Sequence, residues 1–296
     1  MNWLLIVVIA YALNAVAMAI DKTLLRRQVP HPAAYTFYIC ALGIITVVLL
    51  PFDFVIPPAL QMLYNFLAGA TFAIGLYLMF TALKKEDASR VTPFIGGLNP
   101  FIIFILAWLF LGERLATSQI LAFFVILFGT FLISLNFKKG KSFSRAFLIA
   151  IPSAIFLAIS YTITKYAYLN QSFISAFVWI RLSSVVAVLF LLLKKDNRQA
   201  IFATATSSAS GSRYLFLTGQ ACGALSMIMV SWAISIASVS LVNALQGLQY
   251  VFLFAIVLTL KRKNPHLLEE DLSRRVYLQK IISIGLIVFG LFILSW

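Results

Sequence analysis

The sequence predicts an all-α polytopic membrane protein: ten transmembrane helices arranged as two inverted five-helix repeats. Three observations predict this fold. The chain is 62% hydrophobic and only 11% charged, its apolar runs have the length of membrane spans, and its Lys and Arg residues gather in alternate connections. An α-helix needs about 20 apolar residues to cross about 30 Å of hydrocarbon, and it satisfies its own backbone hydrogen bonds.

The apolar spans follow one another with short connections, which leave no room for a soluble domain. The first span follows Met1-Asn2-Trp3 without a basic leader or a small-residue cleavage site, so we interpret it as a retained helix. The longest connections, near 194–213 and 261–276, are expected to hold a flexible Ser-rich tract and a charged segment. We place the spans at residues 2–20, 33–51, 61–82, 90–111, 117–137, 144–164, 172–193, 214–236, 238–260 and 277–296.

The basic residues indicate the orientation. They lie almost entirely in the odd-numbered connections, whereas the opposite face has only Arg114 and Lys165, and Arg181 lies inside the seventh span. The positive-inside rule makes the basic face cytoplasmic and puts both termini outside, in a multi-pass protein of the cytoplasmic (inner) membrane. The net charge of +14 fits anionic lipid head groups. The expected partners are therefore the lipid bilayer and a small-molecule substrate, with no nucleic acid, in a monomer or weak homodimer.

Two halves of the chain, residues 1–137 and 144–296, resemble each other. Val125–Ser134 corresponds to Leu286–Ser295, Ala82–Gly97 to Ala233–Leu248, and Ala17–Lys22 to Ser160–Lys165. Because each half has five spans, the second half enters the membrane with the opposite orientation, an arrangement typical of alternating-access transporters. A symmetric bundle without a transport role is the alternative.

A motif in the first half carries a family resemblance. Ala88-Ser89, Leu98-Asn99-Pro100, Ala107 and Leu111-Gly112-Glu113-Arg114-Leu115, followed by Gln119 and Gly129, resemble the repeat pattern of the EamA-type ten-span transporters of the drug/metabolite transporter superfamily. The resemblance implies ten spans in one membrane domain and export of small metabolites.

The second copy of the motif departs from this pattern. Val251 stands at the position of Pro100, Lys261-Arg262-Lys263-Asn264 replaces the Leu-Gly-Glu turn, and Ala122 stands where the family usually has glycine. The charge bias is also opposite to that of many members, which keep their termini in the cytoplasm. Either the chain is inserted with the opposite orientation, which the strong imbalance of basic residues favours, or the charge bias is misleading here. An inverted insertion leaves the fold unchanged and the direction of transport open.

The sequence gives no sign of an enzyme, a cofactor or a metal site. It has no P-loop, no Ser-His-Asp grouping and no metal-ligand spacing. All nine acidic residues lie at span ends or in connections, whereas a proton-coupled pump usually needs a titratable group deep in the pathway. A facilitator, exporter or exchanger therefore fits better than a pump coupled through a buried carboxylate.

Arg181 is the first candidate for substrate binding. It lies about nine residues from the nearer end of the seventh span, and a guanidinium at that depth is expensive unless it faces water or partner groups. It could hold a carboxylate or phosphate of the substrate bidentately. Alternatively, it hydrogen-bonds carbonyls and hydroxyls as a structural strut, or snorkels. Tyr38 occupies the equivalent position of the first half.

The fourth span contains a candidate hinge. Gly96, Gly97 and Pro100 predict a kink, because proline removes an intrahelical hydrogen bond, and the freed carbonyls would line the pathway with Asn99. The alternative is that the glycines only permit close helix packing. Lys22 and Lys165, at equivalent helix ends, are candidate gate residues or ordinary interfacial anchors.

The ninth span supplies the amide candidates. Asn243, Gln246 and Tyr250 are spaced at i, i+3 and i+7 and are expected on one helix face, with Gln249 nearby. Gln220, Asn14 and Tyr11 are weaker candidates of the same kind. Interhelical hydrogen bonding is the alternative to a substrate pathway for all of them.

We therefore expect a secondary transporter that moves a small polar or amphipathic metabolite by alternating access through a central cavity. Amino acids or related organic anions are the first substrate guess, from the resemblance and from Arg181. The high aromatic content, with 27 Phe and 11 Tyr, also suits a lipid or lipid-linked sugar translocase. A non-transporting membrane scaffold or sensor remains the alternative from another class.

Overall fold

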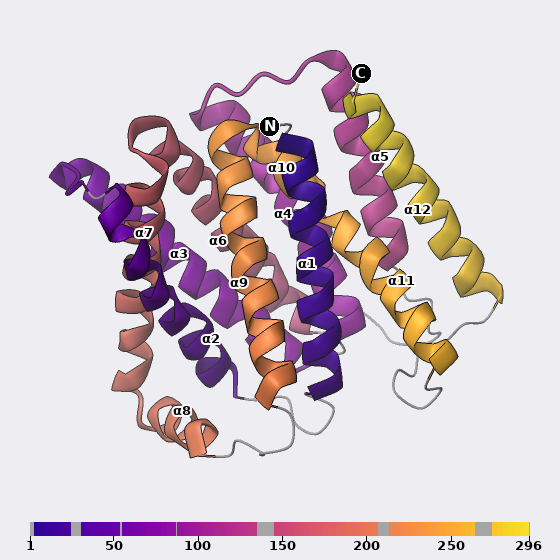
Figure 1. Cartoon of the computed structure of the whole chain (residues 1–296). Helices are drawn as coiled ribbons and strands as arrows, with labels where there is room; N and C mark the ends of the chain where they lie inside the picture. The colour runs from indigo at the N-terminus through magenta and orange to yellow at the C-terminus, as the bar shows by residue number, and fades with distance from the viewer. Residues whose placement is uncertain are drawn as a thin grey trace. The chain divides into compact units, whose positions relative to one another are not determined.

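The computed structural model describes residues 3–24, 31–53, 55–86, 88–134, 145–206, 213–263 and 274–295, and within these ranges it contains helices and no strands. Figure 1 shows the helices in chain order. Their bounds are α1 Trp3–Leu24, α2 Pro32–Ala41, the 3₁₀ helix η1 Leu42–Phe52, α3 Ala59–Leu83, α4 Ala88–Phe110, α5 Thr117–Ser134, α6 Arg145–Asn170, α7 Phe173–Leu189, η2 Phe190–Leu193, α8 Lys195–Thr206, α9 Arg213–Ile236, α10 Val239–Ala244, α11 Gly247–Lys263 and α12 Arg274–Ser295.

Eight helical segments of the described chain are long and apolar enough to cross a membrane, and two shorter apolar helices, Phe94–Phe110 and Thr117–Ile133, accompany them. The second span joins α2 to η1, and the ninth joins α10 to α11. The expected all-helical, multi-pass membrane class is therefore confirmed, while the count of ten spans stays a prediction for the two shorter helices.

The helices form two compact units, and each draws on both sequence halves. Unit 1 comprises Met1–Val29, Arg114–Lys138 and Ala209–Trp296, and unit 2 comprises Pro30–Glu113 and Lys139–Ser208. In unit 1, α1 packs against α9 and α11, and α5 packs against α12. In unit 2, α6 packs against α3 and α4. The first helix of each half thus contacts the third and fourth spans of the other half.

Small residues bring α3 close to two neighbours in unit 2. A Cβ atom on Gly69 would lie 2.5 Å from the Ser184 nitrogen of α7, and one on Gly75 would lie 2.8 Å from Cγ of Leu157 on α6. The hydroxyls of Ser153 and Ser160 on α6 donate to the Gly75 and Ala68 carbonyls, both at 2.8 Å. Small residues that permit close backbone approach are the usual basis of helix packing in lipid.

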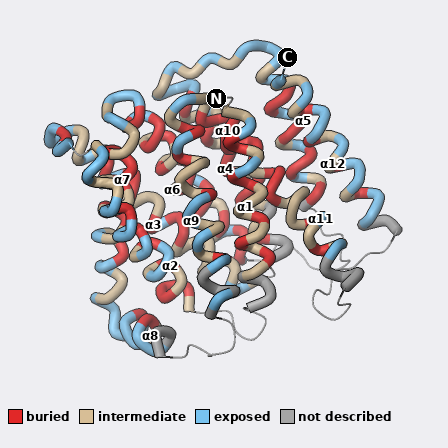
Figure 2. The backbone as a smooth tube through the Cα atoms, in the orientation of Figure 1, coloured by how far each residue is buried: buried red, intermediate tan, exposed pale blue. Residues whose placement is uncertain are grey.

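The helices α5 and α12 of unit 1 run antiparallel. A Cβ on Gly290 of α12 would approach Ile126 of α5, whereas Gln279, earlier on α12, donates to the Leu132 carbonyl, later on α5, at 2.6 Å. Figure 2 shows both helices with buried residues on one side and exposed residues on the other. The exposed side includes large apolar residues, such as Phe128 and Phe289, which suit contact with lipid.

The contacts between α5 and α12 are reciprocal under the repeat alignment. Gly129 corresponds to Gly290, Ile126 to Ile287 and Ala122 to Ser283. A Cβ on Gly129 would meet Ile287 at 2.9 Å and the Ser283 carbonyl at 3.0 Å. A Cβ on Gly290 would meet Ile126 at 2.5 Å and the Ala122 carbonyl at 3.2 Å. Each contact recurs with the two partners exchanged, which is the property of an interface built on a two-fold axis.

Odd-numbered and even-numbered connections lie at opposite ends of unit 2. At one end, Lys84 and Lys194, from the third and seventh connections, act electrostatically on His31 of the first. At the other end, Ser175 and Trp179 donate to the Val55 carbonyl of the second connection, at 2.7 and 3.1 Å. This is the alternation that the basic residues predict.

The connection after the seventh span begins with a helix that the sequence analysis did not predict. It contains the helix α8, in which Asn197 and Ile201 are buried and the charged residues are exposed. The Ser-rich residues at 207–212, on which the expectation of a flexible tract rested, lie outside the described residues. The helix forms before this tract because the residues from Lys194 to Ala203 include Ala, Gln, Arg and Lys, which favour a helix.

Candidate functional site

Two glycines position the backbone of Arg181 in unit 2. On α3, Gly69 lies against Ile180, Ser183 and Ser184 of α7, which flank Arg181. On η1, a Cβ added to Gly43 would lie 3.1 Å from the Arg181 carbonyl oxygen. Because neither contact leaves room for a side chain, the backbone of α7 lies directly against the backbones of α3 and η1. These contacts fix the position of Arg181 along α3.

The guanidinium of Arg181 lies among aromatic side chains. Its Cζ atom is 5.1 Å from the ring centroid of Phe72 on α3 and 5.5 Å from that of Phe177 on α7. Arg181 also lies close enough to Cys40 and Tyr161 to act on both electrostatically. Stacking on phenyl rings offsets part of the cost of desolvating the cation.

One polar atom of Arg181 is left without a partner. Its Nε is buried and makes no hydrogen bond in the part of the chain that the structure describes. The acidic residues of that part lie at helix ends or in connections, as the sequence predicts. A buried guanidinium N–H normally has an acceptor, since an unsatisfied donor costs about 1–3 kcal/mol, and more when it is charged. The Arg181 Nε–H can therefore donate a hydrogen bond to an acceptor group of a ligand.

The fourth span does not interrupt its helix at the predicted kink. The helix α4 continues from Ala88 to Phe110 through Gly96, Gly97 and Pro100, and it ends before Gly112, whose left-handed φ of +65° glycine adopts without strain. Asn99 is 5% exposed, and its Oδ1 atom is buried without a hydrogen-bond partner among the described residues. The hinge role of the three residues stays a prediction.

Two other candidates of unit 2 have protein contacts. The Tyr38 hydroxyl donates to the Ile201 carbonyl of α8 at 2.8 Å, which favours a structural role. Lys165 is 9% exposed near the end of α6, where Glu113 acts on it electrostatically. A cation partly buried beside a carboxylate is compatible with either a gate or an anchor.

The ninth span is the one that is interrupted. Three backbone N–H groups here donate to the carbonyl of the third residue before them, where an α-helix would use the fourth. The pairs are Gln246 to Asn243, Leu248 to Leu245 and Gln249 to Gln246. Gly247 lies in this turn because a Cβ there would overlap the Thr130 hydroxyl of α5. The common face expected for Asn243, Gln246 and Tyr250 stays a prediction, since residues i and i+3 also lie on one side of a 3₁₀ turn. The Asn243 side chain donates to the Val239 carbonyl of its own helix at 2.9 Å.

Two side chains of α1 contact the interrupted segment. Because Gln246 N–H bonds to Asn243, it does not bond to Val242, and the Val242 carbonyl accepts from the buried Tyr11 hydroxyl at 3.0 Å. Asn14 donates through Nδ2 to Oε1 of Gln249 at 2.8 Å. The interhelical hydrogen bonding that was the alternative for Asn14 and Gln249 is therefore present.

The remaining candidates of unit 1 differ in their surroundings. The Tyr250 hydroxyl is buried close to the Gln249 side chain, and Gln246 is half-buried. Gln220 is half-buried on α9, next to Gly219, which packs against Ile20. The Lys22 side chain lies outside the described residues.

Replacing Tyr11 by phenylalanine tests the link between α1 and the interrupted span. The variant leaves the buried Val242 carbonyl without its donor, so we expect a loss of stability of about 1–3 kcal/mol, measured as a lower midpoint of thermal unfolding in detergent. Tyr214→Phe is the matched control, because Tyr214 is 89% exposed. Equal midpoints for the two variants would show that the Tyr11 hydroxyl does not stabilise this segment.

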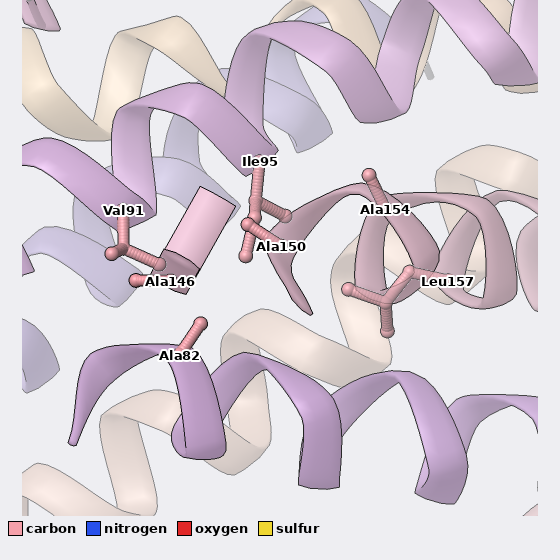
Figure 3. Packing of buried hydrophobic residues seen from close by; sticks show 7 residues of the cluster. All are labelled: Ala82, Val91, Ile95, Ala146, Ala150, Ala154 and Leu157. Carbon is pink, nitrogen blue, oxygen red and sulfur yellow. The ribbon is translucent and has the colours of Figure 1, made fainter. Parts of the chain in front are cut away.

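The polar contacts of unit 1 have an apolar counterpart in unit 2. Under the repeat alignment, Tyr11 and Asn14 of α1 correspond to Ala154 and Leu157 of α6, while Val242 and Gln249 correspond to Val91 and Leu98 of α4. Figure 3 shows Ala154, Leu157 and Val91 within one buried cluster, and Leu98 packs against it. In unit 2, apolar packing therefore stands where unit 1 has these hydrogen bonds.

Sequence reasoning missed the aromatic neighbours of Arg181. Phe177 is one helical turn before Arg181, a spacing that puts both on one face, so the sequence contained that signal. Phe72 comes from another helix and only the fold brings it there. The described residues contain no group of three His, Cys, Asp or Glu side chains that could hold a metal ion.

Comparisons with known proteins agree with the fold and with the motif. Residues 1–135 match the family model described as "EamA-like transporter family", which confirms the resemblance to the drug/metabolite transporters. A solved structure titled "Crystal structure of protein" aligns with a TM-score of 0.69 and 18% identity, over 99% of this chain and 98% of that one. At this identity the similarity shows the fold alone. No curated protein matches the sequence.

Proposed function

We propose that this protein is a secondary transporter of the drug/metabolite type that moves a small polar or amphipathic metabolite, with an amino acid or related organic anion as its substrate class. It works as a facilitator, exporter or exchanger and not as an enzyme. The observation that carries the proposal is the guanidinium of Arg181, which lies against Phe72 and Phe177 with a buried Nε that has no hydrogen-bond partner in the described chain.

The chemistry of this group supports an anionic substrate. A planar carboxylate can accept from Nε and a terminal nitrogen of one guanidinium in parallel, which adds both energy and orientation. The aromatic rings supply apolar surface for the rest of an amphipathic molecule. A structural strut would instead satisfy Nε with a protein carbonyl or hydroxyl, so the orphaned donor favours the substrate role.

Alternating access by two inverted five-span repeats forms part of the proposal. The reciprocal contacts of Gly129 and Gly290 on antiparallel helices support a two-fold relation between the closing spans of the two halves. The matching partners of α1 and α6 support the same relation for the other spans. Inverted repeats of this kind can exchange conformations, and thereby open a site to one side and then to the other.

Orientation in the cytoplasmic (inner) membrane completes the proposal. The odd-numbered connections, which carry most of the basic residues, would face the cytoplasm, and both termini would lie outside. The proximity of His31, Lys84 and Lys194 at one end of unit 2 supports the grouping of these connections.

Ligand-dependent thermal stabilisation tests the substrate class. A library of amino acids and organic anions is added to the purified protein, to Arg181→Gln and to Lys85→Gln, which removes an exposed cation. We expect a carboxylate that raises the unfolding temperature of the parent and of Lys85→Gln, with affinity on the order of 10–100-fold weaker for Arg181→Gln, since a hydrogen bond to a charged group contributes about 1.5–3 kcal/mol.

Transport of the same compound into proteoliposomes should fall in parallel with binding, and Arg181→Lys should restore it only partly, because lysine lacks the planar fork. Equal stabilisation of the parent and Arg181→Gln would remove Arg181 as the anion receptor. If no carboxylate stabilises the parent, and the reconstituted protein moves lipid between the two leaflets, the substrate class is wrong and the protein is a lipid translocase.

A further inference from the structure

The helix α8 combines a cationic side with exposed apolar residues at one end of unit 2. Its inner side is formed by Asn197 and Ile201, which are 6% and 1% exposed, and the Tyr38 hydroxyl bonds to the Ile201 carbonyl. Lys195, Arg198 and Phe202 are exposed and spaced at i, i+3 and i+7, so they share one exposed face of the helix. With 12 residues, α8 is too short to cross a bilayer.

The start of α8 lies at the boundary of the hydrocarbon region. It follows directly on the apolar span Phe173–Leu193, and Phe190 and Leu193 at the end of that span are 65% and 81% exposed. Exposed apolar residues at the end of a span are covered by lipid, and therefore Lys194, Lys195 and Arg198 lie where the head groups begin. Phe202, which is 61% exposed, adds an apolar side chain to the same face.

Further cations surround this end of unit 2. Burial lowers the pKa of His31. The nearby charges of Lys84 and Lys194 lower this pKa further, and the charge of Asp196 opposes them. Lys84 and Lys85 at the end of α3 are exposed, like Lys194, Lys195 and Arg198. The acidic groups described at this end are Asp196 and Glu86, so the positive charge is in excess.

We propose that Lys194, Lys195 and Arg198 form a binding site for the phosphate head groups of anionic phospholipids, with α8 lying in the membrane interface. Basic side chains beside exposed aromatic and aliphatic residues are the arrangement that interfacial helices use. The site is independent of the transported substrate. The site binds a whole phospholipid and not a free phosphate compound, because contact of the acyl chains with Leu193 and Phe202 contributes alongside the charges.

Lipid-dependent thermal stability tests this site in the intact protein. The parent is reconstituted in nanodiscs of phosphatidylcholine, or of phosphatidylcholine and phosphatidylglycerol at about three to one. We expect phosphatidylglycerol to raise the unfolding temperature of the parent but not of Lys194→Gln/Lys195→Gln/Arg198→Gln. Each cation near an anionic surface contributes a factor of about five in affinity, so the triple variant should bind this lipid on the order of 100-fold more weakly.

A second triple variant, Lys138→Gln/Lys139→Gln/Lys141→Gln, changes the net charge equally in the fifth connection and should keep the response to phosphatidylglycerol. If both triple variants lose the response equally, only a diffuse charge effect exists and the site is refuted. The proposal also fails if phosphatidylglycerol does not stabilise the parent, or if glycerol 3-phosphate in detergent reproduces the full effect.

Discussion

Replacing Gly69 by alanine should destabilise the protein by about 3 kcal/mol, at the upper end of the usual cost of overpacking. The added Cβ would lie 2.5 Å from the Ser184 nitrogen and 2.6 Å from the Ile180 carbonyl oxygen, both of them backbone atoms of α7. Backbone in the middle of a helix cannot move aside as a side-chain end can. The helices α3 and α7 must therefore separate, which lowers the midpoint of thermal unfolding.

Gly285→Ala is the matched control for this prediction. Nothing lies within 4 Å of the Cβ position at Gly285 in α12, and alanine favours a helix over glycine by about 1 kcal/mol. The control should therefore be neutral or slightly stabilising, opposite in sign to Gly69→Ala. Similar midpoints for both variants would contradict the close approach of α3 and α7.

Gly69→Ala should also weaken ligand binding, because Gly69 sets the position of Arg181 beside α3. Phe72 is one helical turn after Gly69, so the backbone contact at Gly69 brings the guanidinium to the Phe72 ring. A separation of α3 from α7 moves Arg181 away from this ring. The affinity for the carboxylate found with the parent protein should fall, although no residue that contacts the ligand has changed.

The sequence predicts the membrane class because lipid imposes simple requirements on it. Long apolar runs and basic connections follow from the dimensions of the bilayer and from the positive-inside rule, without knowledge of tertiary contacts. The motif around Leu111-Gly112-Glu113 was also informative, since Gly112 adopts the positive φ that glycine favours. Features that depend on length, charge and local backbone conformation were therefore accessible.

The site was less accessible because its contacts join distant segments. The kink at Pro100 stays a prediction within the continuous α4, whereas the interruption of the ninth span was not predicted; there Gly247 meets Thr130 and Tyr11 satisfies the Val242 carbonyl. Neither partner lies near the ninth span in sequence. The depth of Arg181 could be read from its place in the seventh span, whereas its contact with Phe72 required the packing of α3.

The reciprocal contacts of α5 and α12 predict equal energetic coupling in two pairs of residues. Gly290→Ala should be destabilising because its Cβ meets Ile126, and Gly129→Ala should be destabilising because its Cβ meets Ile287. Each double variant that also replaces the opposing isoleucine by alanine should be more stable than the sum of its single variants predicts, since removal of the isoleucine atoms makes room for the new methyl group. Interaction energies of about 0.5–3 kcal/mol are usual for residues in contact.

The exchanged pairs distinguish a two-fold relation from general crowding of the two helices. Gly290→Ala combined with Ile287→Ala, and Gly129→Ala combined with Ile126→Ala, remove a side chain of the same helix that does not oppose the new Cβ. These doubles should be additive to within about 0.5 kcal/mol. Coupling in only one of the opposing pairs, or equal coupling in all four doubles, would contradict the two-fold relation. The unfolding midpoints need no knowledge of the substrate, so this result bears on the repeats even if the anion proposal fails.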